Sequence, residues 1–364
     1  MERLPSCIAA KNHPAMLVAD APGASRLNRE ETAGRRLHWI DALRGYAILL
    51  VMFTHLDFFP GASVGVQLFF VTSAIALMFS RSAHRETSVT PFFIRRFFRI
   101  APMFWAAIPA FYFLHLLTGG AAADAAQIAS AVTFTHWVKF QWNNAAVPGS
   151  WSIACEVIFY LFFPFVAARI SSARRAAWLL AITVVVAVGL WPVLLWYAAW
   201  TGVSDPHSQH LFAYEAFSSQ APCFALGILV FMSLKEQRLN ALAVGVLGIA
   251  AVVALCFLPD YAARLFLVWA TAFAAIAYAL GSGRIKFLVN RPICAVGLIS
   301  YSAYFWHFFV LEISGWLLPN LNRMENIALV IAATVTLSTF TYLSVERPMM
   351  RLGARLSQRI AGAC

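Results

Sequence analysis

Apolar runs of about 20 residues dominate the chain from residue 40 onward, and short polar connections separate them. A helix of about 20 apolar residues is long enough to cross the hydrocarbon core of a bilayer, which is about 30 Å thick. Backbone polar groups in lipid must be satisfied within their own segment, which favours helices. The pattern therefore predicts an all-α, polytopic integral membrane protein with about ten transmembrane helices. The predicted spans are 40–59, 63–80, 100–118, 150–168, 177–198, 215–233, 239–258, 262–281, 295–317 and 326–344.

The two ends of the chain lack this pattern. Residues 1–38 are polar and carry charges of both signs. Their apolar stretch 16–19 is too short for the hydrophobic core of a signal peptide. We interpret 1–38 as a disordered cytoplasmic tail, 39–352 as the transmembrane domain and 353–364 as a short cytoplasmic tail.

The basic residues fall mainly on one side of the predicted spans. With the N-terminus in the cytoplasm, 24 of the 27 Lys and Arg residues are cytoplasmic or at the inner edge of the first span. Only Lys139, Arg264 and Arg323 lie outside. Membrane proteins show this bias because cytoplasmic connections are enriched in Lys and Arg. The distribution predicts that both termini are cytoplasmic. It also explains the net charge of +11 by topology, so nucleic acid is not a predicted partner.

Composition narrows the class of protein further. Apolar residues make up 61% of the chain and charged residues 12%, against roughly 45–50% and about 25% in soluble domains. This balance excludes a soluble nucleotide-binding enzyme, a disordered regulator and a secreted disulfide scaffold. The six cysteines are dispersed and include no C-x-x-C pair, so neither a metal site nor a disulfide framework is predicted.

Ionisable side chains inside the predicted spans are the strongest functional signal. Such groups are costly in lipid and usually face a bundle interior or an aqueous cavity. Arg44 and His55 lie in the first predicted span and Glu156 in the fourth. His307 and Glu312 lie in the ninth. These five residues are therefore the first candidates for a site.

Arg44 and His55 are eleven residues apart, or about three helical turns, so they share one face of a helix. The helical rise places His55 about 8 Å and Glu156 about 9 Å below the outer face of the hydrocarbon layer. A carboxylate at the depth of a histidine can hold its tautomer and stabilise the imidazolium, as in acid–base dyads. The alternative is a structural polar contact between two helices.

A second cluster precedes the third predicted span. Arg96 and Arg99 are three residues apart and would share one face of a helix. Paired guanidinium groups suit the bidentate recognition of phosphate, because their donors match the spacing of phosphate oxygens. The alternative is an ordinary positive anchor on the cytoplasmic side of the membrane.

Six short motifs occur in order between residues 38 and 352. They are I-D-A-L-R-G at 40–45 followed by His55, G-V-Q-L-F-F-V at 65–71, Arg96-x-x-Arg99 with Pro102 and Trp105, S-W-S-I-A-C-E at 150–156, G-L-I-S-Y-S-A-Y-F-W-H at 297–307 and E-R-P at 346–348. Together they resemble the acyltransferase family 3 of integral-membrane proteins. Members of that family O-acylate sugars of bacterial surface polysaccharides, lipo-oligosaccharide signals and some macrolides. The chain departs from the family at Ala74, where a glycine is usual.

The resemblance implies an O-acyltransferase of the bacterial inner membrane. It would move an acyl group, acetyl first and succinyl as the alternative, from acyl-CoA to a carbohydrate or a glycosylated small molecule. His55 would be the general base and Glu156 its orienting or charge-stabilising partner. Arg96 and Arg99 would bind the phosphates of the donor, with Arg44 lining the route inward. The residues expected to contact substrate are Trp151, Ser152, Tyr301, Tyr304 and His307. Acyl-CoA would be a co-substrate, with no permanently bound cofactor or metal, and membrane lipids would be the other partners.

Two other functions fit part of the sequence. A proton-coupled transporter of a polar or lipid-linked solute would also use interior Arg, His and Glu residues. Transporters tend to show paired broken helices in repeated halves, and the two halves of this chain do not repeat each other. A non-catalytic membrane scaffold is the other alternative, but it gives no reason for a histidine and a carboxylate at matched depth.

Overall fold

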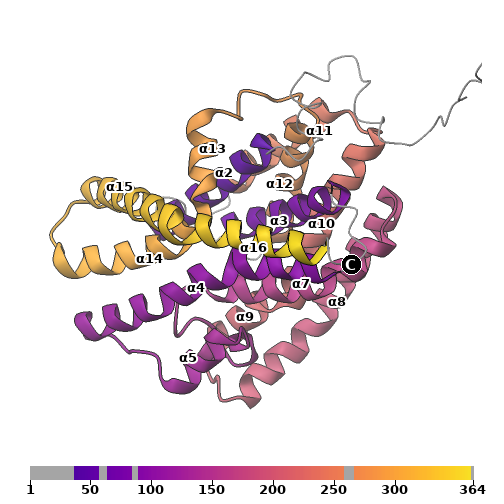
Figure 1. The fold of residues 1–364 in the computed structure, drawn as a ribbon. Helices are drawn as coiled ribbons and strands as arrows, with labels where there is room; N and C mark the ends of the chain where they lie inside the picture. Colours follow the sequence, from indigo (N-terminus) through magenta and orange to yellow (C-terminus); the bar gives the residue numbers. More distant parts are fainter. Residues whose placement is uncertain (1–36, 57–63, 84–88, 258–265, 362–364) are drawn as a thin grey trace, which may run out of the picture. The chain divides into compact units, whose positions relative to one another are not determined.

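The computed structural model describes residues 37–56, 64–83, 89–257 and 266–361, and no β-strand occurs among them (Figure 1). The predicted tail 1–38 lies outside the described residues up to residue 36. The helices up to the middle of the chain are α2 (His38–His55), α3 (Val64–Ala83), α4 (Thr90–Thr118), α5 (Ala125–Val132), η1 (His136–Val138), α6 (Phe140–Asn143), α7 (Trp151–Arg169) and α8 (Ala173–Trp200). Those that follow are α9 (Pro206–Glu215), α10 (Phe217–Glu236), α11 (Ala241–Cys256), α12 (Phe266–Gly281), α13 (Arg291–Leu298), α14 (Ser300–Leu317), α15 (Arg323–Thr341), the π-helix η2 (Tyr342–Glu346) and α16 (Arg347–Ala361).

Several helices have the length and composition of membrane spans, which confirms the prediction of an all-α polytopic membrane protein. Within the described residues, six segments qualify: Val64–Ser82, Thr90–Thr118, Trp151–Arg169, Ala173–Trp200, Pro206–Glu236 and Arg323–Ala361. The pair α13 and α14 qualifies as a seventh if it is one span, although it bends by 74° at its break. Helices α11 and α12 are apolar but shorter. Helix α2 covers the first predicted span but is not among these candidates. The count of ten spans and the cytoplasmic termini stay predictions.

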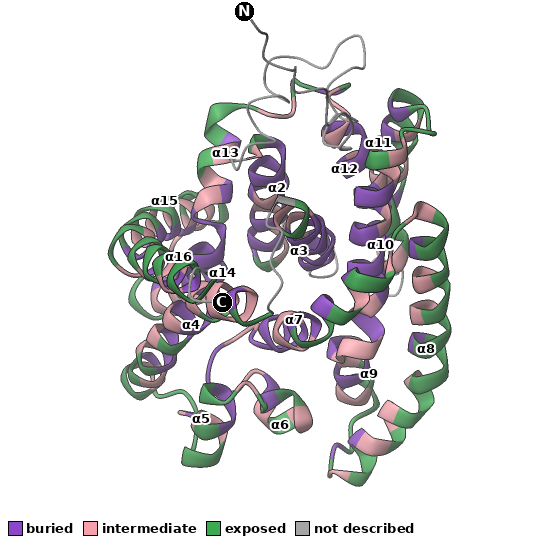
Figure 2. Ribbon diagram, turned by 45° about the vertical axis from the view of Figure 1, so that its right-hand side comes forward, coloured by how far each residue is buried: buried purple, intermediate pink, exposed green. Residues whose placement is uncertain are grey.

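The helices differ in how much of their apolar surface other helices cover. Only 6% of the most apolar window of α8 is buried, against 72% for α3. Trp178, Val185 and Val188 of α8 are exposed, whereas Val71 and Ile75 of α3 are buried. Figure 2 shows α8 largely green and pink, and α3 and α10 largely purple. An apolar helix with an uncovered surface is typical of a membrane span that faces lipid.

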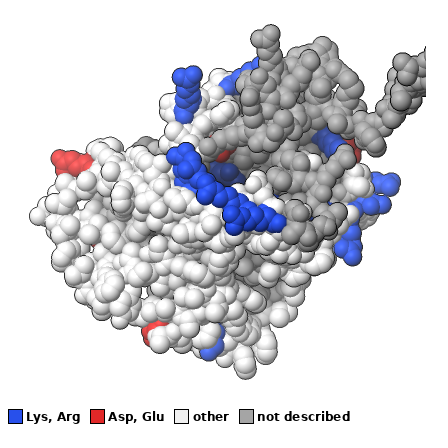
Figure 3. Space-filling view, viewed as in Figure 1, with Lys and Arg blue, Asp and Glu red and all other residues white. Residues whose placement is uncertain are grey.

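The exposed surface of the described residues is also mostly uncharged. Figure 3 shows one face of the molecule, on which most of the described side chains are neither basic nor acidic and the Lys and Arg gather toward the upper and right-hand parts. A surface with few charges is suited to contact with acyl chains, and segregated basic residues are typical of one membrane–water interface.

Helices α2 and α13 cross at close range because two glycines meet backbone there. A Cβ atom on Gly297 would lie 1.8 Å from the carbonyl oxygen of Asp41, and one on Gly45 would lie 2.3 Å from that of Ile293. Small residues of this kind let transmembrane helices approach closely. The crossing places the turn of α2 that carries Arg44 beside the start of α14, and both elements border the cavity described below.

A similar approach joins α3 to α10 at Ala74. Gly227 of α10 lies against Ala74 of α3, and a Cβ on Gly227 would be 2.7 Å from the Cβ of Ala74 and 2.3 Å from the carbonyl oxygen of Val71. The glycine that permits close packing is therefore on α10. The methyl group of Ala74 fits because α10 has no side chain opposite it.

The segment predicted as a short tail, 353–364, is helical as far as Ala361. Gly353 and Ser357 are buried, and α16 packs against α4. A Cβ on Gly353 would lie 2.6 Å from the Cβ of Phe98. Arg355 and Arg359 make this segment too polar to be predicted as a span, although Gly353 and Ser357 are buried.

The long connection between α4 and α7 is tied to α9 by a buried carboxylate. Glu215 accepts hydrogen bonds from the side-chain amides of Asn143, at 2.5 Å, and Asn144, at 3.0 Å. The Ser150 hydroxyl donates to the carbonyl oxygen of Asn143, at 2.6 Å. These bonds anchor the connection directly before Trp151, where α7 begins, and so determine where the first turns of α7 lie.

Candidate active site

A cavity of about 650 Å³, including the part open to solvent, lies between α2, α3, α4, α7 and α14. Each of these helices carries one of the motifs found in the sequence. The lining consists of Arg44, Val66, Phe69, Phe70, Ser73, Arg96, Arg99, Ile100, Ser152, Ile153, Glu156, Tyr160, Ser300, Tyr301 and Tyr304. The cavity therefore brings together side chains that are up to 260 positions apart in the chain.

All three arginines predicted to bind the donor line this cavity, but their surroundings differ. The guanidinium group of Arg96 lies over the ring of Tyr160, at 5.8 Å from its centroid, and near that of Phe92, at 6.0 Å. Its Nε atom has no hydrogen-bond partner among the described residues. Arg44 is 3.9 Å from the carboxylate of Asp41, one turn away on the same helix. Arg96 is thus the arginine whose donors are most available to a ligand.

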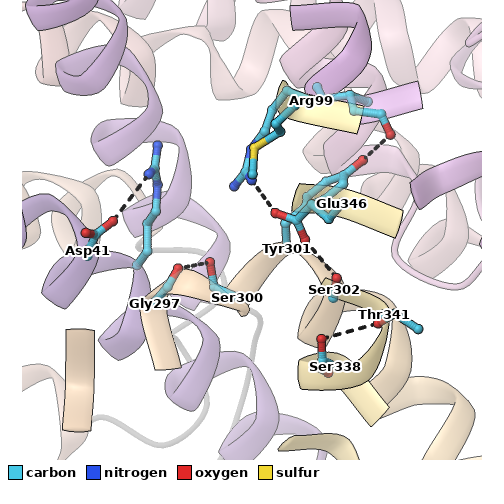
Figure 4. Close-up of polar contacts among 12 residues, drawn as sticks. Asp41, Arg99, Gly297, Ser300, Tyr301, Ser302, Ser338, Thr341 and Glu346 are labelled. Carbon is cyan, nitrogen blue, oxygen red and sulfur yellow. Dashed lines mark hydrogen bonds and ion pairs between the residues drawn. The ribbon is translucent and has the colours of Figure 1, made fainter. Parts of the chain in front are cut away.

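Arg99 forms an ion pair with Glu346, which sequence reasoning did not select as a site residue (Figure 4). The other carboxylate oxygen of Glu346 accepts a hydrogen bond from Ser302, at 2.7 Å. The guanidinium group also lies over the ring of Tyr301, 5.4 Å from the centroid. Glu346 is the last residue of the π-helix η2 and is 1% exposed. The E-R-P motif was the available signal, because it marks a carboxylate at the end of the last predicted span.

Glu156 lines the cavity among hydroxyl groups. One of its carboxylate oxygens accepts hydrogen bonds from Ser73, at 2.5 Å, and from Tyr160, at 2.6 Å. Tyr160 also carries Arg96 over its ring, so the carboxylate and the guanidinium group share a neighbour. Glu156 therefore lies with the predicted donor-site arginines.

His55 and His307 lie together, with ring centroids 5.4 Å apart. The ring of Phe308 is 4.6 Å from that of His55 and 4.0 Å from that of His307. The side chain of His55 is exposed, whereas that of His307 is fully buried. The structure thus places His55 beside a histidine of α14, and neither histidine belongs to the lining of the cavity. The predicted pairing of His55 with Glu156 stays a prediction.

The remaining predicted substrate contacts divide into two groups. Ser152, Tyr301 and Tyr304 line the cavity. The Ser152 hydroxyl donates to that of Tyr304, at 2.9 Å, and the Tyr304 hydroxyl donates to the carbonyl oxygen of Gly149, at 2.9 Å. Trp151 is buried beside Phe70, with ring centroids 6.0 Å apart, and does not belong to the lining. It can act on the site only through its neighbours.

The charge of the lining indicates what kind of ligand it fits. Arg99 is paired with Glu346 and Arg44 lies near Asp41, so Arg96 is the arginine of the lining without a neighbouring carboxylate in an ion pair and is best placed to favour an anion. Among the residues that the structure describes, no three His, Cys, Asp or Glu side chains are grouped closely enough to hold a metal ion. Serine and tyrosine hydroxyls supply further donors and acceptors for a polar ligand.

A polytopic helical membrane protein with an arginine-lined cavity between its helices is the class that these observations define. The chain matches the acyltransferase domain family Acyl_transf_3 over residues 37–343 and belongs to that family, so it is an enzyme that transfers acyl groups. All the residues that line the cavity fall within the matched range.

Two curated proteins are similar over most of this chain. BcsY of Komagataeibacter xylinus, provisionally named a membrane-bound transacylase, is 28% identical over 351 residues, which cover 90% of this chain and 87% of BcsY. The peptidoglycan O-acetyltransferase OatA of Listeria monocytogenes is 25% identical over 356 residues, which cover 86% of this chain and 56% of OatA. No solved structure matches the chain.

Proposed function

We propose that this protein is an O-acyltransferase of the bacterial inner membrane that moves an acetyl group from acetyl-CoA to a hydroxyl group of a carbohydrate. The cavity carries the proposal, because Arg44, Arg96 and Arg99 border it together with Glu156. The names of the similar proteins, a transacylase and a peptidoglycan O-acetyltransferase, support the reaction class and the carbohydrate acceptor. A succinyl donor and a glycosylated small-molecule acceptor are the alternatives within this function.

Arg96 is proposed as the main contact to the phosphates of acyl-CoA. Its guanidinium group is held by the ring of Tyr160, while its Nε atom has no hydrogen-bond partner among the described residues. Arg99 and Arg44 would supply further donors, although each already has a carboxylate near it. Arginine forms charge-assisted, often bidentate bonds to phosphate, which suits a donor of several negative charges.

His55 is proposed as the general base. The imidazole would take the proton from the acceptor hydroxyl while its oxygen attacks the thioester carbonyl carbon. The carbon–sulfur bond then breaks, and the proton passes to the departing CoA thiolate. Ser152, Tyr301, Tyr304 and His307 are proposed to contact the substrates, and Trp151 to act through packing. Glu156 would stabilise positive charge that develops as the reaction proceeds.

The donor site is tested by steady-state kinetics of the purified protein. Release of the CoA thiol from acetyl-CoA is measured in detergent, without a membrane gradient, in the presence of an oligosaccharide acceptor. Arg96→Ala removes the charge-assisted contacts to phosphate, which contribute about 1.5–3 kcal/mol to donor binding. The KM for acetyl-CoA is therefore expected to rise by about 10–150-fold. The exposed Arg174→Ala is the matched control and keeps the wild-type KM. An unchanged KM for acetyl-CoA in both Arg96→Ala and Arg99→Ala would show that these arginines do not bind the donor and serve only as positive residues at the membrane surface.

The catalytic step is tested with His55→Ala. Loss of a general base lowers the turnover number by about 10²–10⁴-fold without changing membrane insertion. Glu156→Gln is expected to lower it less, and His210→Ala, an exposed histidine far along the chain, is the control. Near-normal turnover of His55→Ala at saturating donor and acceptor would contradict the mechanism.

Mass spectrometry of surface glycans from a deletion strain would identify the acceptor and the acyl group together.

A further inference from the structure

Helix α16 carries four arginines at intervals of four residues: Arg347, Arg351, Arg355 and Arg359. Side chains four residues apart are neighbours on the surface of a helix, so the four guanidinium groups form a row, called here the arginine row. All four side chains are exposed, and Figure 3 shows basic side chains in a line where Figure 1 draws α16. Like charges at this spacing repel one another, so an anion beside the row would stabilise it.

The described part of the chain supplies no anion to this row. None of its four arginines forms an ion pair or a hydrogen bond with a described residue. Glu346 is the last acidic residue in the sequence, and its carboxylate is buried and already paired with Arg99. The guanidinium groups of the row are therefore available to an anion that binds from outside.

The rest of the surface of α16 is divided between a buried side and an exposed apolar side. Gly353 and Ser357 are buried, and a Cβ on Gly353 would lie 2.6 Å from the Cβ of Phe98, so this side packs against α4. Leu352 and Ile360 are 42% and 36% exposed, and each directly follows an arginine of the row. Successive residues are about 100° apart around a helix, so apolar side chains border the row. An exposed surface that is basic on one side and apolar on the next is typical of a helix at a membrane surface.

The place of α16 in the chain agrees with such a surface. Helix α16 continues from α15 through η2, and the whole segment Arg323–Ala361 has 39 residues. At 1.5 Å per residue it is about 58 Å long, whereas the hydrocarbon core is about 30 Å thick, so a large part must extend beyond the core. Phe340 and Leu343 are exposed and apolar, and the arginine row begins four residues after Leu343. This change from apolar to basic side chains is expected where a helix passes from acyl chains to headgroups.

We propose that the arginine row of α16 binds the phosphate groups of anionic phospholipids, with Leu352 and Ile360 against the adjoining acyl chains. Guanidinium groups form charge-assisted, often bidentate bonds to phosphate, and basic clusters next to a span attract anionic lipids. A soluble anion would use the arginines but would leave the apolar border without a partner, which favours a lipid. The inference goes beyond the proposed function and does not depend on which acyl donor the enzyme uses.

The test measures the unfolding temperature of the purified full chain in neutral detergent with added phosphatidylglycerol or phosphatidylcholine. A lipid that binds the folded state raises this temperature, by about 2–4 °C at ten times its Kd. Phosphatidylglycerol is expected to give this rise in the wild type, and phosphatidylcholine is not. The rise should be lost in the combined variant Arg351→Gln, Arg355→Gln and Arg359→Gln and largely kept when lysine replaces the same arginines. Raising the ionic strength to about 1 M, where charges are screened beyond about 3 Å, should weaken it in the wild type.

The matched control removes the same number of exposed positive charges from the connection between α12 and α13, by combining Arg284→Gln, Lys286→Gln and Arg291→Gln. This control is expected to keep the wild-type response to phosphatidylglycerol. If the glutamine variant of the row responds as the wild type does, or if both lipids act equally on the wild type, the proposal is overturned. It is also overturned if inorganic phosphate or acetyl-CoA gives the same rise as phosphatidylglycerol, because the row would then bind a soluble phosphate.

A second measurement does not depend on the stability of the variants. Native mass spectrometry of the wild type, prepared with equal amounts of the two lipids, counts the lipid molecules that stay bound. Preferential retention of phosphatidylglycerol that is reduced in the lysine-to-glutamine comparison at the row supports the proposal. Equal retention of the two lipids by the wild type would overturn it.

Discussion

The ionisable side chains between the helices differ in how their charge is compensated. Arg99 has a buried carboxylate opposite it in Glu346. Glu156 is held by the hydroxyls of Ser73 and Tyr160. Arg96 lies over an aromatic ring, and its Nε atom has no hydrogen-bond partner among the described residues. The compensated groups hold the helices in place, and the uncompensated guanidinium group is the one that a ligand can recruit.

Removing one partner of the buried ion pair is expected to destabilise the protein. Glu346→Gln leaves the guanidinium group of Arg99 unpaired, at a cost of at most about 3–5 kcal/mol, since Arg99 also borders the cavity. Adding Arg99→Met to this variant is expected to recover part of the loss. Thermal unfolding in detergent measures both. Equal unfolding temperatures for the wild type and Glu346→Gln would show that the pair contributes nothing to stability.

His136 makes stability depend on pH. It is fully buried in the connection between α4 and α7, and burial lowers its pKa below the ordinary value of about 6.5 although the carbonyl oxygen of Ser150 lies 3.0 Å from its Nε2 atom. The folded state therefore binds its proton less readily than the unfolded state. The stabilisation is complete above about pH 6.5 and is lost as the pH falls from there toward the folded pKa.

Unfolding temperatures between pH 5 and 8 check this dependence. The wild type should lose stability toward pH 5, by up to about 1.4 kcal/mol per pH unit from this residue. His136→Gln keeps a donor to Ser150 but does not titrate, so its curve should be flatter. Parallel curves for the two proteins would contradict the assignment.

The apolar pattern predicts the helices themselves well, since a span of about 20 apolar residues leaves few alternatives in lipid. It predicts less of how they break and pair. The 74° bend between α13 and α14 at Ile299 is not visible in a continuous apolar run. The partner of Arg99 is 247 residues away, and periodicity along one helix carries no information about distant helices. The helical rise likewise predicts the depth of His55 in the membrane, but it does not predict which side chain of another helix lies beside His55.

The crossing of α2 and α13 depends on Gly297. In Gly297→Ala, the new methyl group would meet the carbonyl oxygen of Asp41, so the two helices must separate. Such overpacking costs about 1–3 kcal/mol and displaces Arg44, which should also raise the KM for acetyl-CoA. Gly315→Ala on α14 is the matched control, because nothing lies within 4 Å of its added Cβ. Unchanged unfolding temperature and KM in Gly297→Ala would show that the helices can move apart without consequence.

The whole chain should cross the membrane an even number of times, with both termini in the cytoplasm. The exposed apolar surface of α8 and the segregated basic residues agree with a multi-pass protein, although they do not count its spans. Reporter fusions after residue 361 and within 119–149 are expected to lie on opposite sides of the membrane. Fusions that report the same side would show that the predicted map of spans is wrong.

The ion pair between Arg99 and Glu346 also bears on how the protein is made. The two residues are 247 positions apart, so at about 5–20 residues per second a ribosome adds the carboxylate about 12–50 s after the arginine. Over that interval α4 has left the ribosome with a guanidinium group whose final partner does not yet exist. Nascent chains stalled before residue 346 should therefore hold α4 less firmly than chains stalled after it, and they should be the ones that quality-control proteases degrade.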